Sequence, residues 1–343
     1  MEAPNFPCVT AQPIPFIGMP GLAAIHATAL NVAGLARTDD RRLSADIPTI
    51  AHLFRRPLVV IFCGVEAKGE IMATIADGHV GTGMPPLSGS PAGRAVDRWI
   101  YVYMAASFVV ITLIGFIPDS LMKVAAVQAG TRAPFPLVLH VHAVLMGSFL
   151  LLVLAQTTLA ATGKLERHRW LGRLAMVLVP ALVVAGFILV PTIYHAGWNA
   201  AQSAPPAARA ELQQLVLRRD NIMLLQFRIG ILFPLFIFLG LKARGKDGDF
   251  HKRMMILATA TPLPAAIDRM EWLPTTLPVS PLSTDLYILA VLSPMVVWDL
   301  VRTHKVHRAY LVWLGLYAAV SVALYSAWGT DWWHAIAPRL MGV

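Results

Sequence analysis

The sequence predicts an all-α integral membrane protein, a bundle of about seven transmembrane helices. Its 343 residues are 57% hydrophobic and only 14% charged, with a mean hydropathy of +0.62, far from an ordinary soluble domain. The net charge is +9, and Lys and Arg lie at the ends of apolar runs rather than in one patch. This distribution is typical of membrane orientation, so the expected partner is the lipid bilayer and not nucleic acid.

Residues 1–98 are predicted to be an N-terminal extension that is largely disordered. Residues 1–71 contain scattered Pro and Gly and no lasting amphipathic period. The triplet Lys68–Glu70 precedes Met72 and can be encoded by a purine-rich ribosome-binding sequence. Two interpretations stay open: translation starts at Met72 and residues 1–71 are a mis-assigned start, or the extension is genuine. Residues 72–98 are then a short cytoplasmic tail.

Seven apolar runs follow, each about the ~20 residues that a spanning helix needs. They are placed near 99–117, 137–162, 171–194, 222–243, 254–271, 284–302 and 309–328. The fifth is the weakest because Pro262 and Pro264 interrupt it, although neighbouring helices make such breaks tolerable. Between the third and fourth runs, Ala207–Arg219 is amphipathic and is expected to form a short helix on the outer surface.

Loop charges predict the orientation of these helices. The loops 163–170, 244–253 and 303–308 are rich in Lys and Arg, whereas the loop 272–283 has none. By the positive-inside rule the basic loops are cytoplasmic. The core therefore begins in the cytoplasm and ends outside, in a bacterial inner membrane, with 331–343 as a short C-terminal tail.

On the cytoplasmic side a histidine precedes each of three apolar runs. His168 precedes the third, His251 the fifth and His307 the seventh. Such basic clusters can simply anchor helix ends among the lipid headgroups. Ionisable groups at membrane depth are also functional candidates by default. On that second interpretation His168 and His251 face each other as axial ligands of a cofactor or as a proton entry point.

A second group of polar residues maps to the outer leaflet, and three interpretations of it compete. Its members are His140, His142, His195, Arg228, Asp268 and Arg269. In a haem b site, His142 and His195 hold the iron while Arg228 or Arg269 pairs a propionate. In a zinc site, the ligands come from His140, His142, His195 and Asp268. In a plain polar network, Arg228 pairs with Asp268 and Arg269 with Glu271.

Neighbouring antiparallel helices are expected to bring His195 towards the level of His140 and His142. No compact metal motif such as HExxH, no Gly-rich phosphate loop and no Ser-His-Asp order is readable. Both cysteines precede Met72, so the core has no thiolate ligand. Pro262, Pro264 and Asp268 give a broken, charged helix of the kind that lines transport pathways.

The residues that carry a resemblance are His140-x-His142, Met146-Gly147, Gln156, His168-Arg169-x-x-Gly172-Arg173, Asp249-x-His251-Lys252-Arg253 and Arg269. With these motifs the chain resembles bacterial multi-pass membrane proteins of unknown function over roughly residues 99–330. That resemblance implies an inner-membrane protein and no particular activity. A fainter similarity links the chain to transmembrane di-haem cytochromes b, although its histidines lie mostly at helix ends.

We therefore expect a haem-associated redox or electron-transfer component that works with an electron donor or acceptor. His142 and His195 would hold an outer haem, and His168 and His251 an inner one. The alternatives are a zinc-dependent membrane hydrolase and a membrane transporter or scaffold without a cofactor. The sequence does not determine the oligomeric state.

Overall fold

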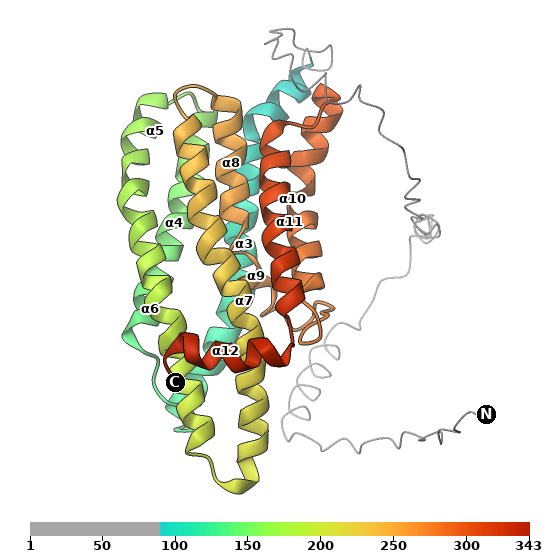
Figure 1. Cartoon of the computed structure of the whole chain (residues 1–343). Helices are drawn as coiled ribbons and strands as arrows, with labels where there is room; N and C mark the ends of the chain where they lie inside the picture. The colour runs from blue at the N-terminus through green and yellow to red at the C-terminus, as the bar shows by residue number, and fades with distance from the viewer. Residues whose placement is uncertain (1–89) are drawn as a thin grey trace, which may run out of the picture. The chain divides into compact units, whose positions relative to one another are not determined.

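The apolar runs fold as long α-helices. The computed structural model describes residues 90–343, and within this part of the chain no β-strand is present (Figure 1). Six helical segments are long and apolar enough to cross a membrane. They are α3 (Pro91–Gln128), α4 (Leu137–Ala161), the α5–η3–α6 segment (Leu165–Leu171, Gly172–Leu174 and Ala175–Gln202), α7 (Pro206–Ala243), α10 (Leu282–Thr303) and α11 (Arg308–Ala327). The fold is thus a multi-pass membrane bundle, as predicted.

The remaining predicted span is a broken helix. It consists of α8 (Gly248–Ala260), a turn that contains Pro262, and α9 (Pro264–Ile267). From Gly248 to Ile267 the segment is about 30 Å long at helical rise, close to the hydrocarbon thickness. Within residues 90–343, six helical segments are thus long and apolar enough to span a membrane, one fewer than the seven predicted, and the fifth predicted run forms this broken helix instead.

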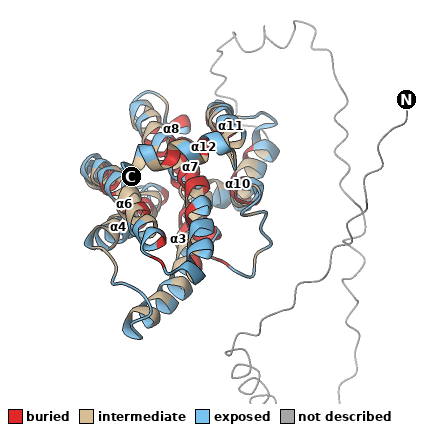
Figure 2. Cartoon of the chain, turned by 60° about the horizontal axis from the view of Figure 1, so that its bottom comes forward, coloured by how far each residue is buried: buried red, intermediate tan, exposed pale blue. Residues whose placement is uncertain are grey.

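The broken helix lies at the centre of the bundle. Every residue from Ile256 to Thr261 is buried, and α8 packs against α7, α11, α3 and α10 while α9 packs against α3 and α10. Figure 2 shows buried residues gathered on the inner faces of α7, α8 and α3, with exposed residues on the outer faces. Exposed apolar side chains such as Val144, Phe187 and Val177 suit contact with lipid.

The two ends of the bundle are the α5 end and the α12 end. At the α5 end, α3, α5, α8 and α11 begin and α7 and α10 stop (Figure 1). At the α12 end, α12 (Asp331–Met341) lies across the bundle and contacts α6 and α7. There the indole Nε1 of Trp333 donates to the carbonyl of Asp220 at 2.8 Å. The predicted C-terminal tail is therefore mostly a packed helix.

Several helix boundaries differ from the sequence prediction, and for two of them the sequence supplies the reason. The first helix begins at Pro91 rather than near 99, because Ser90 caps it by accepting from the backbone N–H of Gly93 at 3.0 Å. The amphipathic stretch Ala207–Arg219 is the first part of α7 and not a separate surface helix. No Pro or Gly follows it before Gly230, so the helix continues. The expectations for residues 1–89, including a start at Met72, lie outside the described residues.

Candidate functional site

Two histidines at the α5 end face one another. His168 lies on α5 and His251 lies on the first turns of α8. Their ring centres are 6.5 Å apart and their ring planes are nearly perpendicular, at 87°. Both side chains are partly buried. The structure therefore brings together the two residues that the sequence assigns to an inner site.

Backbone carbonyls hold both imidazoles by the same nitrogen. Nδ1 of His168 is 3.1 Å from the carbonyl oxygen of Gln156, and Nδ1 of His251 is 2.8 Å from that of Gly240. A carbonyl can only accept, so each Nδ1 carries the proton and donates it. Nε2 of each ring is then the nitrogen with a free lone pair. This arrangement is typical of histidines that ligate metals.

The side chain of Gln156 is an unusual neighbour of this pair. Its Oε1 and Nε2 atoms are both buried, and neither has a hydrogen-bond partner among the described residues. It lies against the α5–α6 junction, since a Cβ added to Gly172 would be 3.4 Å from Nε2. A buried amide without partners is costly and calls for an explanation. The backbone carbonyl of the same residue accepts from His168, so the orphaned amide belongs to the residue that holds one ring of the pair.

Four charged residues at the α5 end are paired with one another. Arg253 forms an ion pair with Asp299, to which the hydroxyl of Tyr310 also donates. Asp97 is held by Arg302 at 2.9 Å and by Nε1 of Trp298 at 2.9 Å. Within residues 90–343 no carboxylate forms an ion pair with either imidazole of the pair. The histidine pair therefore stands outside the ion pairs that the structure shows at this end.

The outer histidines are placed differently from the prediction. His142 lies against Gly186 of α6, where an added Cβ would be 3.8 Å from the ring Cε1. His195 follows Gly186 by nine residues on α6. It therefore lies about 13 Å along the helix axis from the level of Gly186 and His142. Its Nε2 contacts the carbonyl of Met341 on α12. The structure therefore does not bring His142 and His195 together.

His140 lies two residues before His142 at the start of α4. It is exposed, and its ring packs edge-on against Phe135 with centres 6.1 Å apart. Asp268 is exposed just after α9. Within the described residues no three His, Cys, Asp or Glu side chains come close enough to hold a metal ion. The predicted zinc ligands, His140, His142, His195 and Asp268, are therefore not assembled into one group.

The two arginines of the outer group are committed to partners that the sequence did not indicate. Arg228 Nη2 is 2.7 Å from Asp285 Oδ1, and Nη1 donates to Ser321 Oγ at 2.8 Å. The predicted pairing of Arg228 with Asp268 is thus wrong, because Asp285 at the start of α10 reaches it instead. Arg269 Nε is 3.2 Å from Asp119 at the end of α3, so the predicted pairing with Glu271 is wrong as well.

Three further carboxylates were missed by the sequence reasoning. Asp220 accepts from the hydroxyl of Tyr194 at 2.8 Å and lies 2.9 Å from Nδ1 of His334. Asp119 and Asp299 form the ion pairs described above. A signal was available for Asp299, because it lies within the predicted span 284–302, and ionisable residues in such helices usually have a partner. The partner itself depends on how the helices pack.

Comparison of the chain with protein-family models, with curated proteins and with solved structures gave no match. The resemblance to bacterial multi-pass membrane proteins therefore stays a prediction. The geometry of the site carries the functional argument alone.

Proposed function

We propose that this multi-pass membrane protein binds a b-type haem between His168 and His251 and serves in electron transfer. The observation that carries the proposal is the pair of imidazoles, each held by a carbonyl at Nδ1, with both Nε2 atoms left for a ligand. Haem supplies one-electron redox chemistry when it is bound, and axial histidines set its potential.

The spacing of the rings supports this ligand. A metal–imidazole bond is about 2 Å long, so two axial imidazoles have ring centres about 6 Å apart. The observed separation is 6.5 Å. The unpaired amide of Gln156 adds a polar group to the same end of the bundle.

The cations that could pair haem propionates differ from those first expected. Arg228 and Arg269 are held by Asp285 and Asp119, so they are not free for this role. Arg169 adjoins His168 in sequence and is exposed at the α5 end. Arg244, whose charge acts on His251, is a second exposed arginine at this end. Both guanidinium groups are of the kind that pairs a carboxylate.

The side of the membrane on which the proposed haem site lies is inferred from the loop charges. The loops 163–170, 244–253 and 303–308 at the α5 end carry nine Lys and Arg, whereas the loop 272–283 at the other end carries none, so this end faces the cytoplasm of a bacterial cell. The haem would lie near that face and exchange electrons with a soluble donor or acceptor. An outer haem is not part of the proposal, because His142 and His195 lie far apart. No observation favours the zinc hydrolase or the transporter.

The test is the absorption spectrum of protein purified from haem-replete cells. We expect a Soret band that shifts on reduction with dithionite and one haem per chain. His168→Ala and His251→Ala should each lose the band, while His168→Met should restore haem with an altered spectrum. His304→Ala, an exposed histidine at the same end, is the matched control and should keep the band. A folded but colourless wild-type protein, or alanine variants with full haem, would overturn the proposal.

A further inference from the structure

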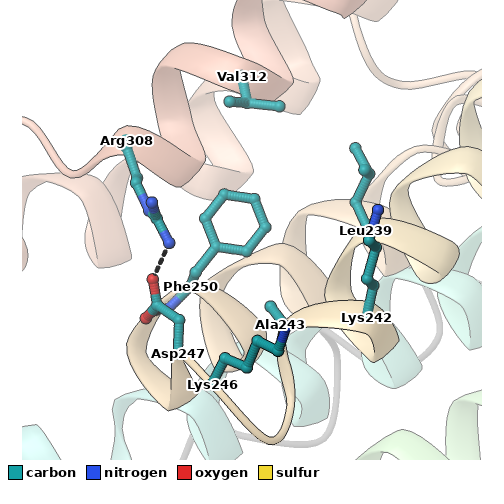
Figure 3. Close-up of a pocket in the computed structure, with 8 residues that line it drawn as sticks. All are labelled: Leu239, Lys242, Ala243, Lys246, Asp247, Phe250, Arg308 and Val312. Carbon is teal, nitrogen blue, oxygen red and sulfur yellow. Dashed lines mark hydrogen bonds and ion pairs between the residues drawn. The ribbon is translucent and has the colours of Figure 1, made fainter.

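A shallow hollow of about 300 Å³ lies at the α5 end, away from the histidine pair. Its walls come from the end of α7, the start of α8 and the start of α11 (Figure 3). Three cationic side chains line it, those of Lys242, Lys246 and Arg308, together with the single carboxylate of Asp247. The described lining therefore carries a net charge of +2, from three positive groups and one negative group.

The carboxylate in this hollow is already occupied. Asp247 accepts from the backbone N–H of Phe250 at 2.9 Å and forms an ion pair with Arg308, which Figure 3 shows as a dashed line. Burial alone would raise the pKa of Asp247, but the Phe250 N–H and the Arg308 guanidinium outweigh it and leave the pKa below its usual range. The pair Asp247–Arg308 is thus neutral as a unit. The positive charge that remains belongs to the lysines.

Neither lysine has an ionic partner within residues 90–343. The ammonium of Lys242 lies 5.9 Å from the ring centre of Phe238, and Lys246 lies in the turn after α7. Both side chains are exposed. Two lysines that line one hollow and have no ionic partner give it a positive potential that attracts an anion.

The hollow changes from cationic to apolar along two helices. Leu239 lies one turn deeper than Lys242 on α7, and Val312 lies one turn deeper than Arg308 on α11. The ring of Phe250 fills the space between these helices (Figure 3). A ligand that fits must therefore carry a negative head at the membrane surface and an apolar chain that runs into the bilayer.

We propose that this hollow binds an anionic phospholipid, with the phosphate at Lys242 and Lys246 and an acyl chain along Leu239, Phe250 and Val312. The positive charge of the hollow favours an anionic lipid, because a zwitterionic headgroup brings no net negative charge to the lysines. Basic pockets between helices on the cytoplasmic side of a membrane are where anionic headgroups bind. The site is separate from the histidine pair and does not depend on haem.

The experiment counts lipids bound to the full chain by native mass spectrometry after transfer from nanodiscs. Nanodiscs of phosphatidylglycerol and of phosphatidylcholine are compared, each with wild type and with Lys242→Gln/Lys246→Gln. The matched control is Lys164→Gln/Lys305→Gln, which removes two exposed lysines from other loops at the same end. We expect wild type and control to retain phosphatidylglycerol over phosphatidylcholine. The double variant should bind it about 30-fold more weakly, at about 1 kcal/mol for each lysine.

Three results would overturn the proposal. The first is equal retention of the two lipids by wild type. The second is equal loss of phosphatidylglycerol in the test and control variants, which would mean general attraction to the membrane. The third is displacement of the lipid by inorganic phosphate at similar concentration, which would assign the lysines to a soluble anion. Haem content is unaffected by any of these outcomes, so the two proposals fail separately.

Discussion

Arg253 and Asp299 tie the broken central helix to α10 by two hydrogen bonds. Nε of Arg253 donates to Oδ2 at 2.6 Å and Nη2 donates to Oδ1 at 2.8 Å. The side chains are only 5% and 6% exposed. Because α8 begins just before Arg253 and carries His251 two residues earlier, this pair fixes the segment that presents one of the two imidazoles.

Removal of the negative partner should be strongly destabilising. Asp299→Asn removes the carboxylate that accepts two hydrogen bonds from the buried Arg253 guanidinium and leaves only Asp249, at 3.6 Å, as a counter-charge. Breaking a buried pair in this way costs about 3–5 kcal/mol. The measurement is the free energy of unfolding in detergent. Glu211→Gln is the matched control, because Glu211 is exposed and forms no ion pair within residues 90–343. The control should lose less than about 1 kcal/mol. Similar stabilities for the two variants would contradict the structural role of Arg253–Asp299.

A close approach of α3 to α9 gives a second prediction. A Cβ on Gly115 would lie 2.1 Å from the carbonyl oxygen of Ala266, so Gly115→Ala must push the two helices apart. We expect a loss of about 1–3 kcal/mol or more in the free energy of unfolding. Gly230→Ala on α7 is the control, since no atom lies within 4 Å of its added Cβ. It should be neutral or stabilise by up to about 1 kcal/mol. A tolerated Gly115→Ala would show that α9 does not pack where the structure has it.

The spans could be predicted because hydrocarbon imposes their length and apolar character. The same reasoning ranked the segment with Pro262 and Pro264 as the weakest span, yet it is the central one. Its hydropathy is modest because its neighbours, rather than lipid, surround it, and the freed backbone groups are shielded inside the bundle. Hydropathy therefore reports exposure to lipid and not importance for packing.

The candidate site was predictable only in part. His168 and His251 precede helices on the same side of the membrane, so loop charges were sufficient to place them at one level. The predicted clustering of the outer group was wrong because the depth of a residue in the membrane does not determine which helices pack together. Arg228 reaches Asp285 across the bundle rather than Asp268, and His195 lies well past the level of His142. Lateral packing is a tertiary property that one sequence without relatives does not reveal.

The capping carboxylate of α8 should make stability depend on pH. Asp247 caps the helix by accepting from the Phe250 N–H, and its pKa is lowered in the fold. Its charge therefore stabilises the protein above the unfolded pKa of about 3.9, and this contribution is lost as the pH falls through the lower folded pKa. Asp247→Asn keeps a capping oxygen and removes the charge.

The measurement is the thermal midpoint of wild type and Asp247→Asn across a series of pH values. Wild type should be more stable by a constant amount above about pH 4, and the difference should shrink below it. Asp247→Ala, which also loses the cap, should be weaker than the Asn variant by about 1 kcal/mol. A difference that grows as the pH falls would reverse the sign of the argument and refute it.

The unpaired amide of Gln156 offers a test that separates stability from ligand binding. A buried amide without partners costs about 1–3 kcal/mol, so Gln156→Leu should raise the thermal midpoint of the haem-free protein. If the amide contacts a bound haem, the same variant should release haem faster than wild type. Gln226→Leu, an exposed glutamine on α7, is the control and should change neither quantity. A Gln156→Leu variant that is less stable without haem would show that the amide has a structural partner. An unchanged rate of haem release would show that the Gln156 amide does not contact the haem.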